Sequence, residues 1–579
     1  MRPIRVANCS GFYGDRLSAA REMVDGGPID VLTGDWLAEL TMLILARQRR
    51  RDPNRGYAHT FITQMKEVMA DCLERGIRIV SNAGGLSPVG CAQALSEIAG
   101  DLGISPVIAW VEGDDLLPRL SEFKAKGISL PHIQTGEPLP ERPVIAANAY
   151  LGAWGIAKAL EMGADIVITG RVTDASLAVG PAAWYYSWGR TNWDCLAGAV
   201  VAGHVIECGA QATGGNFSFF QEVPGLDHPG FPIAEIFEDG SSVITKHPGH
   251  GGMVTVETVT AQLLYEIGGP RYLNPDVTAR FDSIQAEQIG PDRVRIGGVY
   301  GEPPPSTAKV AVVYEDGWRS TATLYIAGLE VAEKANLAVR SIADQLPPEV
   351  ALETHLLRTD RPDPLTNEDA LAQLRMTARA QRKDLLSEGF ARSVIGLALS
   401  TYPGFFVDHV PAVEEFSPYW PAVLPSTELT QLVTINGHRI PVPPTVATTS
   451  EQRQLPPPVI PFAEASEELT RVPLGQLFGA RSGDKGGDCN LGIWARNEHA
   501  YAWIANHLTE DRLKDLLPEV RVLPVERYLL PRLLAVNFVI TGVLGQGVST
   551  TSRLDAQGKS LAEWLRSRII EIPRELIDG

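Results

Sequence analysis

The first 200 residues alternate between short apolar, β-branched runs and longer segments with an apolar face at helical spacing. The short runs predict six strands, at residues 4–8, 29–33, 77–81, 106–111, 144–148 and 165–169. The helical spacing predicts helices at residues 15–24, 35–49 and 60–75, with Pro88 in the first turn of another. This alternation predicts a mostly parallel, doubly wound sheet, a fold that binds ligands outside the carboxyl ends of its strands.

The pattern becomes mixed after residue 200. Two strand-like runs, 308–314 and 319–326, flank Asp316 and Gly317, which predicts a β-hairpin with a permissive Asp-Gly turn. A helical pattern follows at residues 330–345, so this part of the chain predicts a second, mixed α/β lobe. Proline runs at 441–444 and 456–458 and an acidic stretch at 464–468 predict an extended linker.

The last part of the chain has strand and helix patterns of its own. Strands are predicted at 474–479, 490–495, 520–525 and 535–540, and helices at 499–516 and 560–570. This order predicts a small ferredoxin-like α+β domain. The predicted organisation is a parallel α/β lobe (1–200), a mixed α/β lobe (201–455), a Pro-rich linker (456–472) and a ferredoxin-like C-terminal domain (473–579).

Charge and cysteine usage narrow the class of protein. The net charge is 51 − 69 = −18, which argues against a nucleic-acid or anionic-membrane partner, because binding to phosphates needs a basic surface. No run of 18 apolar residues and no signal-peptide pattern is found, so we expect no membrane span. The six cysteines form no CxxC pair, which favours reduced thiols and a cytoplasmic protein.

Candidate chemistry gathers where the predicted strands end. Residues 9–15 and 81–88 place glycines between a strand and a helix, where backbone N–H groups suit an anionic ligand. A plain turn, with Asp15 as the helix N-cap, explains the first segment equally well. The candidate ligand-binding residues in these two segments are Ser10, Gly11, Asn82, Gly84 and Gly85.

The strand predicted at 165–169 is followed by Arg171, Thr173 and Asp174. An arginine binds a carboxylate or phosphate through two parallel hydrogen bonds, so Arg171 is a candidate catalytic residue. Asp174 has three open interpretations: a helix cap, an orienter of Arg171 or a base. Thr173 is a candidate binding residue.

Two further segments contain histidines. His204 and Glu207 are three residues apart, so on a helix they share a face and could transfer protons; no HExxH motif is present, and we expect no metal site. Asn216 in the following glycine-rich stretch is a candidate binding residue. Lys246, His247 and His250 precede a helix predicted near Met253 and combine anion affinity with groups that titrate near neutral pH. Gly251 and Gly252 are candidate binding residues beside them, and structural histidines are the alternative.

Charged residues also interrupt the C-terminal domain. The segment 478–490 separates two predicted strands and is longer than most hairpin connections, so it predicts a loop. Its candidate binding residues are Arg481, Asp484, Lys485, Asp488 and Asn490. A solvated loop is the ordinary alternative, but this set of charges is large for a plain turn. Cys208 and Cys489 are expected to be buried, inert thiols.

Together these segments resemble the acyclic terpene utilisation protein A (AtuA) family, formerly a domain of unknown function. The resemblance is carried by IRVANCSGFYGDR, IVSNAGGLSPVGCA, DIVITGRVTDASLAVGP, GHVIECGAQATGGN, KHPGHGGMVTVETVTAQLLYEIGGPRYLNPDV and GEPPPSTAKV. ARSGDKGGDCNLGIWAR resembles the family's ferredoxin-fold C-terminal domain. Cys489 departs from the small residue, such as alanine, expected in this segment, which argues against an obligatory cysteine mechanism.

The resemblance implies a role in degrading citronellol- and geraniol-type terpenes, beside carboxylase, hydratase and lyase steps. It favours an enzyme that acts on a branched acyl-CoA or related carboxylate by hydration, dehydration or carbon–carbon lyase chemistry. The alternative is a noncatalytic scaffold or accessory subunit that assembles with carboxylase-pathway proteins. A nucleotide-dependent enzyme is less favoured, because GxGxxG and P-loop motifs are missing. We expect a homo-oligomer, and the sequence assigns no cofactor.

Overall fold

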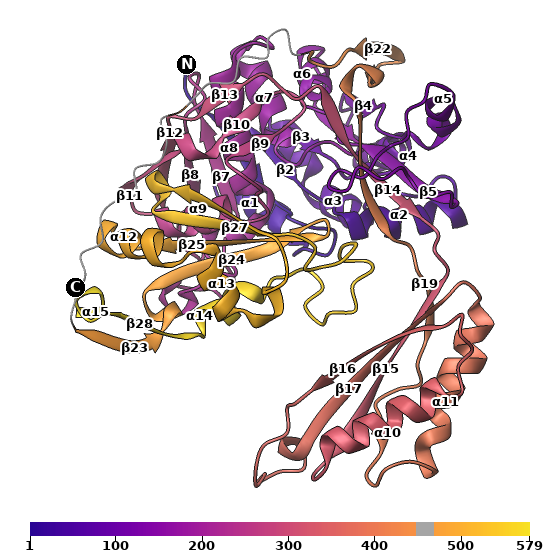
Figure 1. The fold of residues 1–579 in the computed structure, drawn as a ribbon. Helices are drawn as coiled ribbons and strands as arrows, with labels where there is room; N and C mark the ends of the chain where they lie inside the picture. The colour runs from indigo at the N-terminus through magenta and orange to yellow at the C-terminus, as the bar shows by residue number, and fades with distance from the viewer. Residues whose placement is uncertain (447–454, 456–467, 579) are drawn as a thin grey trace.

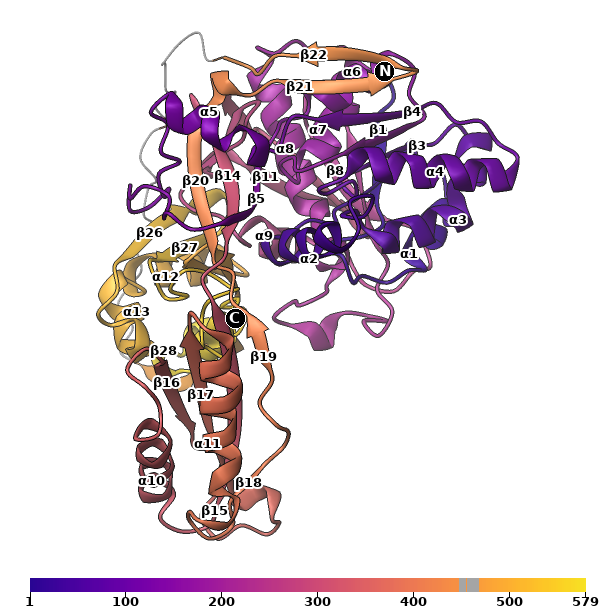
Figure 2. The same ribbon diagram turned by 90° about the vertical axis from the view of Figure 1, so that its right-hand side faces the viewer.

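The computed structural model describes residues 1–446, 455 and 468–578. The chain forms a large α/β lobe, a smaller lobe that projects away from it, and a C-terminal domain packed against the large lobe (Figures 1 and 2). The predicted proline run at 456–458, most of the acidic stretch and the start of the predicted linker lie outside the described residues. Among the described residues, no helix is both long and apolar enough to cross a bilayer.

The centre of the large lobe is a parallel sheet, as the strand–helix alternation predicts. Its strands lie in the order β1 (Ile4–Asn8), β2 (Val31–Gly34), β3 (Arg78–Ser81), β6 (Ile166–Thr169) and β4 (Ile108–Glu112). Side chains alternate along each strand between two apolar cores. One core is closed by α1 (Ala19–Asp25), α3 (His59–Glu74) and α4 (Pro88–Leu102), the other by α6 (Trp154–Glu161), α7 (Ser176–Tyr186) and α8 (Trp193–Glu207).

Antiparallel strands extend this sheet at both edges to eleven strands. On the β1 side lie β7 (Pro232–Ile236), β8 (Ser242–Lys246), β12 (Arg293–Gly297) and β11 (Gln285–Gly290). On the β4 side lie β21 (Gln431–Ile435) and β22 (His438–Val442). Strands that the sequence assigns to a second, mixed lobe therefore belong to the same sheet as the parallel strands and lie at its edges.

One strand assigned to the parallel sheet belongs elsewhere. β5 (Val144–Ala149) is a strand where the sequence predicts one, but it pairs with β14 (Thr307–Tyr314) in a three-stranded sheet completed by β20 (Tyr419–Pro425). The apolar run predicts a buried strand, whereas nothing in its pattern selects the sheet. Tyr150 directly follows β5, and Lys309 lies on β14, so this small sheet positions both side chains.

The predicted hairpin across Asp316 and Gly317 is wrong. β14 and β15 (Trp318–Ala327) are both strands, but β15 pairs with β17 (Leu371–Ala380), β18 (Phe406–Val407) and β19 (Val413–Glu415). The chain leaves the large lobe at the Asp-Gly step and returns beside it, since the Asp316 N–H donates to the Phe416 carbonyl. A turn signal marks a change of direction but does not fix which strands pair.

These strands form the projecting lobe, residues 317–416. Its sheet has the order β16 (Ala351–Leu357), β17, β15, β18. α10 (Val331–Ala343) and α11 (Ala391–Gly396) cover one face and share an apolar core with it (Figure 1).

The C-terminal domain has a four-stranded antiparallel sheet in the order β24-β25-β27-β26, and its elements follow the predicted α+β pattern. The strands are β24 (Phe478–Lys485), β25 (Asp488–Ala495), β26 (Val525–Leu530) and β27 (Ala535–Ile540). α12 (Glu498–His507), α13 (Glu510–Leu516) and α14 (Leu561–Arg566) accompany them, and β23 (Leu469–Pro473) pairs with β28 (Ile569–Pro573). The predicted helix 499–516 is thus two helices, the strand predicted at 520–525 begins at Val525, and the helix predicted at 560–570 ends at Arg566.

The segment 478–490 is not the predicted loop. β24 and β25 form a continuous hairpin in which Lys485 lies opposite Asp488 and only Gly486 and Gly487 make the turn. Gly486 has φ +66°, and a Cβ on Gly487 would lie 2.1 Å from the Gly545 carbonyl oxygen, so both positions require glycine. The charged residues therefore stand on strands, at fixed positions relative to the large lobe.

Asn490 is one of the buried polar links between this hairpin and the large lobe. It is fully buried; its amide donates to the Leu264 carbonyl and to Asn537, and its oxygen accepts from the Glu266 N–H at 2.8 Å. Nearby, Trp494 enters the core of the large lobe and stacks on Phe217 at a centroid distance of 6.0 Å. Polar and apolar contacts together hold the hairpin in one position.

We expect Asn490→Ala to lower the free energy of unfolding by about 1–3 kcal/mol, because it leaves buried backbone groups of Leu264 and Glu266 without partners. Urea unfolding of the full chain measures this. Asn506→Ala, at an exposed position on α12, is the control and should change the free energy by less than ~0.5 kcal/mol. Equal effects of the two substitutions would contradict the assigned role of Asn490.

Candidate functional site

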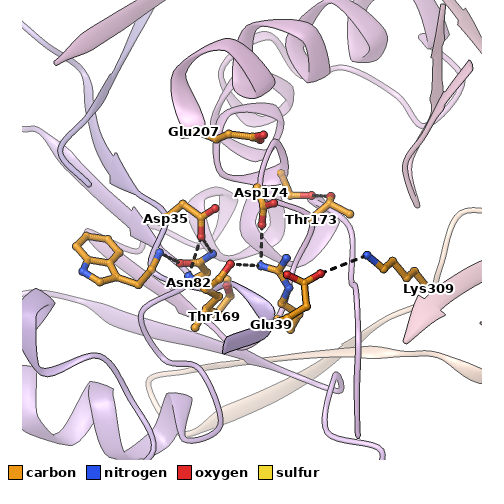
Figure 3. A network of polar contacts seen from close by, with 12 residues as sticks. Asp35, Glu39, Asn82, Thr169, Thr173, Asp174, Glu207 and Lys309 are labelled. Carbon is orange, nitrogen blue, oxygen red and sulfur yellow. Dashed lines mark hydrogen bonds and ion pairs between the residues drawn. The ribbon is translucent and has the colours of Figure 1, made fainter. Parts of the chain in front are cut away.

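The carboxyl ends of β1, β2 and β6 meet α8 at a pocket with polar walls. The pocket is lined by Asn8, Thr33, Asp35, Asp174, Leu177, Ala178, Gly203, Ile206 and Glu207. Figure 3 shows the surrounding polar network, in which Asp174 and Glu207 lie above the strand ends and Lys309 approaches from the side. The rule that parallel sheets bind ligands at their carboxyl edge therefore identifies this region.

Arg171 lies at the centre of this network, where the sequence predicts a candidate residue. Its side chain is 4% exposed, and one guanidinium nitrogen donates to Asp174 at 2.7 Å and to the Leu37 carbonyl at 3.0 Å. The guanidinium also stacks over the Tyr150 ring, 4.2 Å from its centroid. Arg171 is thus already paired by the protein.

Asp174 does not cap α7. The helix begins at Ser176 after Ala175, which makes no side-chain cap, and the Asp174 carboxylate turns to Arg171 instead. Its side chain is 30% exposed and lines the pocket. Of the three interpretations of Asp174, helix capping is therefore wrong, and the ion pair with Arg171 is present.

Asp35, which follows β2, faces Asp174 across the pocket. It accepts hydrogen bonds from the Asn82 amide at 2.5 Å and from the Leu37 N–H at 2.9 Å. Asn82 in turn accepts from the Trp36 N–H at 2.9 Å, so it orients Asp35. Burial, with the nearby charge of Asp174, raises the pKa of Asp35 well above its ordinary value. Asp35 therefore favours its protonated form.

His204 and Glu207 share a face of α8, as their spacing predicts, with His204 Nδ1 3.0 Å from Glu207 Oε1. Burial lowers the pKa of His204 to about 4, so its imidazole is neutral near pH 7. Burial and the charge of Asp174 raise the pKa of Glu207. Within the described residues, Glu207 Oε2 has no hydrogen-bond partner, although it is buried beside the pocket. Such an atom is suited to a ligand or a transferred proton.

Lys309 is a residue of this site that the sequence analysis does not single out. It lies on β14, with its ammonium 3.8 Å from Glu39 and 4.7 Å from the centroid of the Tyr150 ring. Tyr150 therefore contacts two cations, Lys309 and Arg171. Burial alone would raise the pKa of Glu39, but Lys309 and Arg171 hold it below its ordinary value.

The C-terminal hairpin brings Asp484 and Lys485 toward this group. Lys485 donates to the Glu266 carbonyl at 3.0 Å, and the charges of Glu39 and Glu207 act on it. Burial, with Glu266, raises the pKa of Asp484 to about 8. The Lys485 side chain is exposed. Desolvation by the protein around it, together with the positive charge of Lys309, lowers its pKa to about 8. Both groups thus titrate close to neutral pH.

The other predicted residues of the hairpin make structural contacts. Arg481 stacks over Tyr265 and hydrogen-bonds Gln211, which also accepts from Asn216. Asp488 accepts from Gln134 and from the Gly542 N–H. Asn490 makes the domain contact described above.

Lys246, His247 and His250 form a separate cluster. Lys246 pairs with Asp292 at 3.1 Å and donates to the His250 carbonyl at 2.7 Å. The His247 ring is 2.9 Å from the Met23 carbonyl and packs against Gly26. α9 begins at Val256 rather than near Met253. Their contacts therefore run to α1 and to the turn between β11 and β12, and the structure does not join them to Arg171.

Close packing accounts for the glycines of the predicted binding turns. A Cβ on Gly11, Gly84, Gly251 or Gly252 would lie within 2.6 Å of a backbone atom, and Gly85 has φ +52°. Ser10 donates to the Phe12 carbonyl, and Thr173 hydrogen-bonds Ser176. α1 begins at Ala19, so Asp15 is not its cap and instead accepts from the Gly11 N–H. No group of three or more His, Cys, Asp or Glu side chains suited to a metal ion occurs among the described residues.

Comparison with protein families matches residues 4–435 to the family described as acyclic terpene utilisation family protein AtuA. Residues 472–571 match the AtuA ferredoxin-like domain, which confirms the predicted C-terminal domain type. No curated protein and no solved structure matches the chain.

The raised pKa of Asp484 gives a test based on stability. Its ordinary pKa is 3.8 and its folded pKa is about 8, so folding favours the protonated carboxyl, and this contribution is lost as the pH rises from about 4 to 8. We expect Asp484→Asn to gain thermal stability relative to the unmodified chain over that range. Thermal unfolding at a series of pH values measures the difference, and a difference independent of pH would contradict the shift.

Proposed function

The chain belongs to the AtuA family of acyclic terpene utilisation proteins, and on this premise we propose that it is an enzyme acting on a branched acyl-CoA or a related carboxylate. The reaction proposed is hydration, dehydration or carbon–carbon bond cleavage. The observation that carries the proposal is the pocket at the carboxyl edge of the sheet, where acidic side chains with raised pKa values lie beside cations.

These reactions need the same three groups. In hydration of a 2,3-unsaturated thioester, a base takes a proton from water, the oxygen bonds to C3, and an acid protonates C2. In lyase cleavage of a 3-hydroxy thioester, a base takes the hydroxyl proton, the C2–C3 bond breaks, and an acid protonates C2 of the resulting enolate. In both, negative charge develops on the thioester oxygen and needs a positive group nearby.

Lys309 is best placed to supply that positive group. Its ion pair with Glu39 is long, at 3.8 Å, and its side chain is 34% exposed, so a substrate oxygen can reach the ammonium. Arg171 is enclosed and already bonded to Asp174 and the Leu37 carbonyl. We therefore assign Lys309 to the thioester or carboxylate oxygen, and Arg171 to positioning Asp174.

Glu207 and Asp174 supply the acid and the base. Glu207 favours its protonated form, and in the described part of the chain its Oε2 has no hydrogen-bond partner, which suits the proton donor. Asp174 is ion-paired with Arg171 and partly exposed, which suits a carboxylate that accepts a proton. Asp484 and Lys485 stand on the hairpin and titrate near neutral pH, so we propose that they exchange protons with the site from the C-terminal side.

We expect Glu207→Gln and Lys309→Met each to lower turnover by ~100-fold or more, because one removes the proton donor and the other the charge on the thioester oxygen. Turnover is measured by mass spectrometry of branched 2,3-unsaturated and 3-hydroxy acyl-CoAs in isotopically labelled water. Glu333→Gln and Lys334→Met, on α10 of the projecting lobe, are the matched controls and should retain full activity.

Thermal shift with CoA, branched acyl-CoAs and the free acids tests binding separately from turnover. Binding at about 100 times the dissociation constant would stabilise the chain by about 2.7 kcal/mol. Neither turnover nor a shift with any of these compounds would contradict the proposal. That result would favour the scaffold alternative, which copurification with carboxylase proteins, lost on deletion of residues 470–579, would then support.

A further inference from the structure

The projecting lobe has a long sheet edge with which no described strand pairs. β16 is the terminal strand of its sheet, and its seven residues pair with β17 in an unbroken register from Ala351 to Leu357. Its outer backbone N–H and C=O groups therefore face away from the sheet. Such an edge is a ready template for another strand.

Some other sheet edges of the molecule carry features that block pairing. β22 contains Pro441, β20 contains Pro421, and β11 is bulged near Gln288. β18, at the opposite edge of the projecting sheet, has only two residues. β16 has no proline, lysine or bulge, although its side chains are largely exposed. β16 therefore lacks the features that block pairing at those edges.

The order of residues along β16 is self-complementary. We propose that β16 pairs antiparallel with β16 of a second copy of this chain, with Thr354 at the two-fold axis. Glu353 then lies opposite His355 of the partner subunit, and Leu352 lies opposite Leu356 of the partner subunit. Each of these two pairs occurs twice in the dimer, because a two-fold axis repeats every contact.

The two faces of the strand agree with this register. Leu352 and Leu356 pack partly against the apolar core under the helices, so their pairing extends that core across the axis. Glu353 and His355 project from the other face, since side chains alternate along a strand. The His355 imidazole can hydrogen-bond the Glu353 carboxylate opposite it, whereas two like charges opposite each other destabilise an antiparallel pair.

Neighbouring registers are worse. Shifting the axis to Glu353 places that carboxylate against itself, and shifting it to His355 places the imidazole against itself. Within one subunit, Glu353 lies 3.4 Å from Arg379 and His355 lies 3.0 Å from Ser552. Neither contact uses the backbone groups at the outer edge of β16. The lobe projects away from the large lobe in both views (Figures 1 and 2), and the segment 549–552 of the C-terminal domain contacts one face of its sheet. The result of the pairing is a continuous ten-stranded sheet across two subunits.

Sedimentation of the full chain tests the interface. We expect a dimer that Thr354→Lys converts to monomer, because two ammonium groups would meet at the axis, whereas Thr354→Val, a β-branched replacement, retains the dimer. A monomeric unmodified chain, or a Thr354→Lys variant that remains dimeric, would overturn the proposal. Thermal unfolding of each variant verifies that the lobe is folded.

A charge exchange tests the register. Glu353→Lys should raise the dimer dissociation constant by about tenfold, and adding His355→Glu should restore it, because a lysine and a glutamate then face each other across the axis. Failure of the second substitution to restore the dimer would overturn this register. Amide hydrogen exchange supplies a second measurement: residues 351–357 should gain protection as protein concentration rises, and unchanged exchange would also overturn the proposal.

Discussion

The candidate site depends on the charge of Arg171, which makes the burial of neighbouring carboxyl groups feasible. Asp174 pairs with it directly, and Asp35 and Glu39 lie within its field. Leaving an ionised carboxylate unpaired in such a place costs several kcal/mol, so each one needs either a cation or a proton. Arg171 meets this need for Asp174, and Lys309 meets it for Glu39. Among the described residues, Asp35 and Glu207 make no ion pair with a lysine or an arginine, and burial raises the pKa of both.

The architecture explains why these groups meet. Asp35 and Arg171 follow parallel strands, whose carboxyl ends lie at one edge of the sheet. α8 brings Glu207 over the same edge, while the separate sheet of β5 and β14 adds Tyr150 and Lys309. Tyr150 joins these two parts, because its ring contacts both cations. The small sheet thus contributes to the polar network beside the pocket, although it lies outside the parallel sheet.

The sequence predicts the parallel sheet and the part of the site attached to it. Arg171, Asp174 and Glu207 follow from strand ends and helix spacing, and the same rule applied to the strand ending near Thr33 would also have found Asp35. Lys309 is harder to find. Its one signal is a lone charge in an apolar strand, and its role depends on β14 pairing with β5 rather than with β15. Pairing between distant strands is a tertiary outcome that a local pattern does not encode.

The structure of the C-terminal hairpin also could not be predicted from the local sequence pattern. Its glycines and charges resemble a loop in the sequence, whereas Trp494 and Asn490 anchor it to the large lobe as two regular strands. This anchoring places an acid and a base, Asp484 and Lys485, where their pKa values converge near 8. At the sheet edge, nearby cations lower the pKa of Glu39, whereas burial raises the pKa values of Asp35 and Glu207. At the hairpin, the surroundings bring the pKa values of a carboxyl and an amine together. Acid and base functions are therefore assigned by what surrounds each group, and only the folded chain supplies those surroundings.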